Sequence, residues 1–137
     1  MKQKVLSIFL MFAVICSFAM ITEPAQASDS GILCWACIRN AGAGLSITSS
    51  GYATCTGSLT HSGSSGKVQV TLQRYQNSAW TAIKSWSDSR TGAICGVTGN
   101  YYITKGYSYR VKVSVYVYNS SGSLLESDTV YSSTKSY

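Results

Sequence analysis

Residues 109–118 read Tyr109-Arg110-Val111-Lys112-Val113-Ser114-Val115-Tyr116-Val117-Tyr118. The odd-numbered positions of this stretch are all apolar or aromatic, and the even-numbered positions are mostly polar. Because successive side chains of a strand point to opposite faces, the two sets occupy opposite faces. The stretch therefore predicts an antiparallel strand with one face in a core and the other towards solvent.

The same alternation recurs along the chain between clusters of Gly, Ser and Asn, and no later segment shows the apolar spacing of a helix. Further strands are expected over residues 43–48, 52–60, 67–75, 80–86, 93–103 and 123–131. The turn Gln76-Asn77-Ser78 joins two of them, while Gly96 and Gly99 indicate a bulge or break in another. About seven short strands at this spacing predict an all-β protein, a single antiparallel Greek-key β-sandwich.

The hairpin over residues 109–131 is expected to pair residues whose numbers have an even sum. Leu125 then faces the valine row, and Glu126 and Asp128 share the opposite face with Arg110 as weak surface charge pairs. An odd sum would turn both carboxylates towards the core, at a high cost in free energy.

Residues 1–27 predict a secretory signal peptide that is cleaved. Two lysines near the start precede an apolar run over residues 5–21, and Ala25-Gln26-Ala27 supplies the small residues of a cleavage site between Ala27 and Ser28. We therefore expect a secreted, extracellular protein with no membrane anchor after cleavage.

The remaining chain is expected to contain an N-terminal segment, residues 28–42, and a β-sandwich domain, residues 43–137. The whole chain has a net charge of +6, and its Lys and Arg residues are scattered rather than clustered. A dispersed positive surface argues against a nucleic-acid partner. It suits weak attraction to an anionic cell-wall polymer outside the cell.

Four cysteines follow residue 27, namely Cys34, Cys37, Cys55 and Cys95. An even number in a short secreted chain predicts two disulfides, with Cys34 and Cys37 each bonded to Cys55 or Cys95 and the N-terminal segment thereby tethered to the sheet. A thioredoxin-type redox pair would need a helix after Cys37, and a zinc site would need a second close pair of ligands. Neither pattern is present, so no metal and no cofactor is expected.

The order of several residues along the chain resembles fibronectin type III and related immunoglobulin-like sandwiches: Val68-x-Val70-x-Leu72, then Trp80, then Tyr107-x-Tyr109-Arg110-Val111-x-Val113, and then Gly122. This resemblance implies a two-sheet Greek-key sandwich with Tyr107 or Tyr109 as the tyrosine corner. The whole chain is also similar to a family of small secreted proteins of unknown function from Gram-positive bacteria. That second resemblance implies export and carries no assigned activity.

No catalytic constellation is found. His61 is the only histidine and is expected to be a solvated loop residue. The chain contains no nucleophile elbow, phosphate loop or zinc-protease motif. The sequence therefore predicts a protein that is not an enzyme.

Exposed aromatic side chains are the remaining candidates for a site, because such rings stack on sugars and anchor protein interfaces. The ligand-contact candidates are Tyr101, Tyr102, Tyr116, Tyr118 and Trp86. Trp80 and Trp86 share one parity, with Lys84 between them. The predicted function is a non-catalytic binding module at the cell envelope, for a glycan or a protein. The alternative is a small cationic, bacteriocin-like antibacterial protein.

Overall fold

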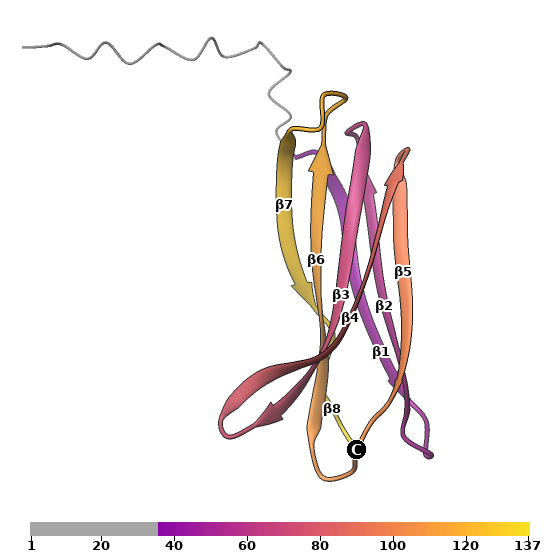
Figure 1. Ribbon diagram of the computed structural model, residues 1–137, viewed down its shortest axis with the longest axis vertical. Helices are drawn as coiled ribbons and strands as arrows, with labels where there is room; N and C mark the ends of the chain where they lie inside the picture. The colour runs from indigo at the N-terminus through magenta and orange to yellow at the C-terminus, as the bar shows by residue number, and fades with distance from the viewer. Residues whose placement is uncertain (1–35) are drawn as a thin grey trace, which may run out of the picture. The chain divides into compact units, whose positions relative to one another are not determined.

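The computed structural model describes residues 36–137, which contain eight β-strands and no helix. The strands are β1 (Ile38–Ile47), β2 (Tyr52–His61), β3 (Ser65–Gln76), β4 (Ala79–Thr91), β5 (Ile94–Tyr102), β6 (Ser108–Tyr118), β7 (Leu124–Tyr131) and β8 (Lys135–Ser136). The small sheet has the order β1-β2-β5, and the large sheet has the order β4-β3-β6-β7. The short strand β8 pairs with β6 (Figure 1).

All strand pairs are antiparallel, and the chain crosses between the two sheets after β2, β4 and β5. This arrangement confirms the predicted all-β, antiparallel Greek-key sandwich. The strands interleave in this way because each amphipathic strand buries its apolar face against the other sheet.

The core consists of the inward side chains of both sheets. In β6, the residues from Tyr109 to Val117 with odd numbers are at most 1% exposed, while the alternate residues are half-buried. The alternation that predicted this strand is therefore confirmed. Full burial of each valine contributes about 1.5 kcal/mol or more to folding.

Tyr109 fixes the connection between β5 and β6. Its buried hydroxyl donates a hydrogen bond to the carbonyl oxygen of Thr104 at 2.7 Å and accepts one from the Thr104 N–H at 3.2 Å. A tyrosine at the start of a strand that bonds to backbone a few residues upstream is a tyrosine corner. Of the two tyrosines that the resemblance offered for this role, Tyr109 has it.

The predicted register of the β6–β7 hairpin is wrong. Val117 pairs with Glu126 and Val115 with Asp128, and a register shift next to this pair leaves Leu125 as an extra residue in β7. The bulge turns both carboxylates to the valine side. Burial is avoided because β7 is the edge of the sheet: Asp128 is exposed, and Glu126 Oε2 accepts a hydrogen bond from the Ile38 N–H at 2.8 Å.

The β-domain begins earlier than expected. Strand β1 starts at Ile38, so residues 38–42 belong to the small sheet and not to the predicted N-terminal segment. The signal peptide, the Ala27–Ser28 cleavage site and Cys34 lie outside the described residues. No helix in residues 36–137 is long and apolar enough to cross a bilayer.

Candidate binding surface

The structure does not bring the five predicted aromatic residues together. Tyr116 and Tyr118 are half-buried on the outer face of β6, where the ring of Tyr116 lies 6.0 Å from Lys67 Nζ. Tyr102 is 70% exposed and lies in β5, on the other sheet. Its neighbour Tyr101 has the opposite parity on the same strand. These rings therefore cannot contact one ligand at the same time.

Trp86, the fifth candidate, packs against the core. Its register partner is the buried Val70, and its indole rests on the backbone of Gly99, where a Cβ atom would collide with the ring. This contact also corrects a prediction about β5. The strand pairs with β2 in one unbroken register, so Gly99 makes room for an indole instead of marking a bulge.

Trp80 faces the opposite way from Trp86 because β4 contains a bulge. Leu72 pairs with Lys84 and Gln73 with Ala82, which leaves Ile83 between two paired residues. One extra residue reverses the parity of the strand beyond it. The sequence pattern places both tryptophans on one face of the strand, but in the structure Trp86 faces the core and Trp80 faces the outer surface.

Trp80 belongs to a cluster on the outer face of the large sheet, formed by Tyr75, Trp80, Arg110 and Tyr131, which we call the arginine clamp. The Arg110 Cζ atom lies 4.3 Å from the ring centroid of Trp80 and 4.3 Å from that of Tyr131. Arg110 Nε donates a hydrogen bond to Gln73 Oε1 at 2.8 Å. The Tyr75 ring lies 5.2 Å from Trp80 and extends the aromatic surface.

Strand pairing places these side chains together from four strands. Gln73 pairs with Arg110, and Tyr75 pairs with Trp80, while Tyr131 lies on β7 next to β6. No carboxylate of residues 36–137 forms an ion pair with Arg110. The two ring contacts, each contributing about 0.5–1 kcal/mol at an exposed site, therefore orient the guanidinium without neutralising it.

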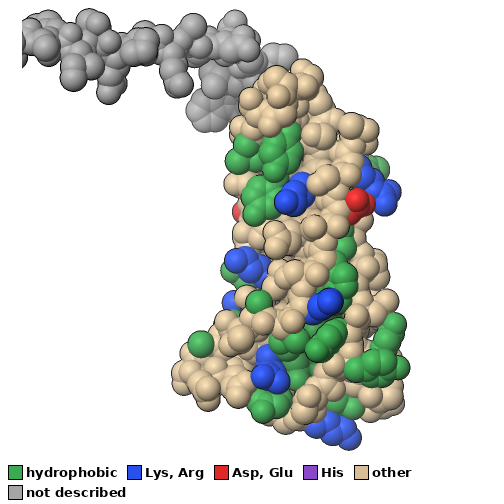
Figure 2. Space-filling model, viewed as in Figure 1, with side chains coloured by type: hydrophobic (Ala, Val, Ile, Leu, Met, Phe, Trp, Pro, Cys, Tyr) green, Lys and Arg blue, Asp and Glu red, His purple; other side chains and the backbone are tan. Residues whose placement is uncertain are grey.

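The outer face of the large sheet is positively charged. Lys67 and Lys112 lie on it with Arg110, in adjacent strands β3 and β6. Glu126 and Asp128 have the core-side parity of β7 and so do not project from this face. Figure 2 shows basic and hydrophobic side chains interspersed on the viewed side of the β-domain, with few acidic ones.

Asp88, the third acid among residues 36–137, is already paired. Its carboxylate accepts a hydrogen bond from Arg90 Nε at 2.6 Å, and this bond lowers the pKa of Asp88 below its ordinary value. Asp88 pairs with the buried Val68, so its side chain lies on the core side of the edge strand β4 and not on the outer face. The positive charge of the outer face therefore has no acid beside it in the described part of the chain.

The predicted disulfides to Cys55 and Cys95 are wrong. Both thiols are free and buried, and Cys37 is disulfide-bonded elsewhere. Cys95 lies opposite Leu59, four residues along β2 from Cys55, which separates the two cysteines by about 13 Å. Strand β2 also lies between β1 and β5, so Cys37, which directly precedes β1, and Cys95 on β5 are at least about 10 Å apart, beyond the reach of a disulfide.

His61 is buried, contrary to the prediction of a solvated loop residue. It ends β2 with the inward parity and is only 2% exposed. Gly66 provides its space, since a Cβ atom there would lie 2.6 Å from His61 Nε2. Neither ring nitrogen has a hydrogen-bond partner. No group of three or more His, Cys, Asp or Glu residues within 36–137 could hold a metal ion.

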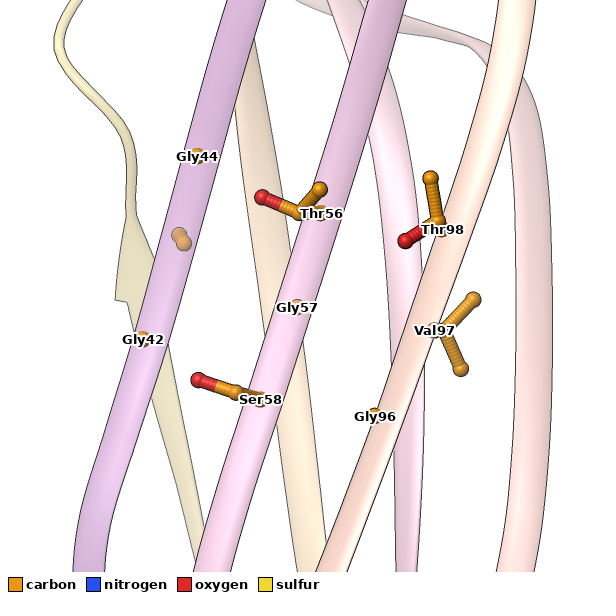
Figure 3. A pocket seen from close by; sticks show the side chains of 9 residues that line it. Gly42, Gly44, Thr56, Gly57, Ser58, Gly96, Val97 and Thr98 are labelled. Carbon is orange, nitrogen blue, oxygen red and sulfur yellow. The ribbon is translucent and has the colours of Figure 1, made fainter.

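A shallow trough on the outer face of the small sheet is the other candidate site. It holds about 340 Å³ and is lined by Gly42, Ala43, Gly44, Thr56, Gly57, Ser58, Gly96, Val97 and Thr98. The hydroxyls of Thr56 and Ser58 point towards Gly44 and Gly42 of β1 (Figure 3). Ser58 Oγ lies 2.7 Å from the position that a Cβ atom of Gly42 would occupy. The lining contains no titratable side chain and no aromatic ring, so the trough offers neither acid–base chemistry nor a stacking surface.

The arginine clamp was missed by sequence reasoning because its members are far apart in the chain and one of them depends on a bulge. The alternation of residues 109–118 does place Arg110 outward, and this was the one available signal. No protein-family model, curated protein or solved structure matches the chain. The function is therefore inferred from the chemistry of the surface.

Proposed function

We propose that the protein is a secreted, non-catalytic binding module that binds a glycan of the cell envelope through the outer face of its large sheet. The observation that carries the proposal is the arginine clamp, in which Tyr75 and Tyr131 are 44% and 50% exposed around an oriented guanidinium. Exposed rings on a sheet are suited to stacking on pyranose faces. The export predicted from residues 1–27 would bring this face to the envelope.

The surface between the clamp and Tyr116 supports the same function. Gln69, Thr71 and Ser114 lie on this face between the two aromatic ends, and Thr71 shares a hydrogen bond of 3.0 Å with Ser85 of β4. Amide and hydroxyl groups donate and accept hydrogen bonds, as sugar hydroxyls require. A polar centre with aromatic rings at both ends suits an extended chain of sugars.

Retention of the purified protein on isolated bacterial cell walls tests this proposal. Trp80→Ala and Tyr131→Ala remove the two rings that hold Arg110, and each is expected to weaken retention about tenfold. Tyr102→Ala is the matched control, because it removes an exposed ring from the other sheet. The control should bind like the unaltered protein.

Absence of retention of the unaltered protein would refute the proposal, and so would equal losses in all three variants. A growth-inhibition assay on the same bacteria separates the binding module from the antibacterial alternative. A binding module leaves growth unchanged, whereas an inhibition zone would support the alternative.

A further inference from the structure

Three side chains contact the guanidinium of Arg110, and its terminal nitrogens form an open edge. Its Cζ atom lies 4.3 Å from the ring centroids of both Trp80 and Tyr131, and its Nε donates a hydrogen bond to Gln73. The terminal nitrogens form no hydrogen bond or ion pair with any residue that the structure describes. We propose that this open edge binds the carboxylate of an acidic polysaccharide, an inference that rests on the function proposed above.

The chemistry of the open edge favours a carboxylate. A guanidinium presents two parallel N–H donors that match the two oxygens of a carboxylate, and such paired bonds are stronger than bonds between neutral groups. A neutral sugar offers only hydroxyl groups, which would leave the positive charge of Arg110 unmatched. The charge of the site is therefore complementary to an acidic sugar and not to a neutral one.

The neighbouring rings favour a sugar acid over a simple polyanion. Tyr75 and Tyr131 are partly exposed beside the guanidinium, so the pyranose ring that carries the carboxylate has an aromatic surface on which to stack. A linear phosphate polymer has no ring to place there.

Further cations continue along the face. Lys112 is two residues from Arg110 on β6, at a spacing of about 7 Å. Lys67 pairs with Tyr116, six residues from Arg110, at about 20 Å. A polysaccharide with repeated carboxylates would meet positive charge at several of its units.

Binding of three soluble polymers to the full protein tests the inference: polygalacturonate, polyphosphate and neutral dextran, each measured by calorimetry at low and moderate salt. The expected result is that polygalacturonate binds at least tenfold more tightly than either of the others. Arg110→Gln should lose about tenfold in affinity for polygalacturonate, and Arg110→Lys should not restore it, since an ammonium group lacks the fork.

Arg39→Gln is the matched control, because it removes one exposed positive charge from β1 of the other sheet, and it should bind within about twofold of the unaltered protein. Thermal unfolding of each variant shows that it is folded. Polyphosphate binding as tight as polygalacturonate binding would overturn the inference, as would equal losses for Arg110→Gln and Arg39→Gln.

The two proposals fail in different ways. Equal binding of dextran and polygalacturonate, with retention on cell walls intact, overturns the carboxylate assignment and leaves the glycan-binding function standing. Loss of retention on cell walls removes the function itself.

Discussion

Arg110 shows how neighbouring side chains prepare a surface charge for recognition. A free arginine side chain has about 2 kcal/mol of rotamer entropy to lose when a ligand orders it. Trp80 and Tyr131 of the clamp, together with Gln73, have already ordered the guanidinium in the folded protein. Less entropy is then lost on binding, so the same contact gives a higher affinity.

His61 illustrates the opposite situation, in which a polar group is buried without a partner. Both of its ring nitrogens lack hydrogen bonds, and each unsatisfied buried polar group costs about 1–3 kcal/mol. Gly66 admits the imidazole because it has no side chain. The parity of β2 explains the burial, since His61 continues the inward row of Cys55 and Leu59.

The buried thiol of Cys55 should be unreactive in the folded protein. Burial raises its pKa from 9.0 to about 11, so at pH 8 only about 0.1% of it is thiolate, the reactive form. We expect alkylation by iodoacetamide, followed by mass spectrometry, to leave Cys55 and Cys95 unmodified in native protein and to modify both in urea. Raising the pH towards 11 should speed the alkylation of Cys55, because a larger fraction of the thiol is then ionised.

An introduced surface thiol, Ser123→Cys, provides the control because Ser123 is exposed, and it should be alkylated rapidly at pH 8. Equally rapid modification of Cys55 in native protein would mean that the sheets separate in solution.

Two single-residue bulges decide which side chains reach the outer face. The bulge at Ile83 sends Trp80 outward and Trp86 inward, and the bulge at Leu125 turns Glu126 towards β1. Without the second bulge, Glu126 and Asp128 would lie on the outer face, opposite Tyr116 and Ser114. The positive charge of the outer face thus depends on one residue in an edge strand.

The β3–β4 hairpin, whose tip curves away from the rest of its sheet in Figure 1, ends in a two-residue turn. Asn77 and Ser78 have φ values of 53° and 61°, the pattern of a type I′ turn. Serine is disfavoured there and glycine is not. Ser78→Gly is therefore expected to raise the free energy of unfolding in urea by about 0.5–1 kcal/mol.

Ser120→Gly is the matched control, since Ser120 is an exposed turn residue without a positive φ. It should leave stability unchanged or lower it slightly. A destabilising effect of Ser78→Gly would show that the turn has a different geometry in solution.

Sequence reasoning predicted the strands well because the alternation of period two is a local signal, as in residues 109–118. It failed beyond bulges, because no local pattern marks Ile83 or Leu125 as the residue left unpaired. The inward position of His61 depends on a space opposite it that Gly66 provides from another strand. The clamp requires side chains from four strands, and their proximity follows only from the order of strands in the sheet.

The two outer faces of the sandwich differ in chemistry. The small sheet presents hydroxyl groups and glycines, as in the trough over Thr56 and Ser58. The large sheet presents oriented aromatic rings with unpaired positive charge. The outer face of the large sheet is therefore suited to recognising an acidic glycan. The outer face of the small sheet lacks these features and serves as the control surface in binding experiments.

Nuclear magnetic resonance mapping of the ¹⁵N-labelled protein, titrated with polygalacturonate, shows directly which face of the sandwich the polymer touches. If the polymer binds the arginine clamp, the indole N–H signal of Trp80 and the Nε–H signal of Arg110 shift. The indole signal of Trp86, which packs against the core, and the amide signals of Thr56 and Thr98 then stay in place. Shifts confined to Thr56 and Thr98 would place binding on the small sheet and would rule out the arginine clamp as the binding site.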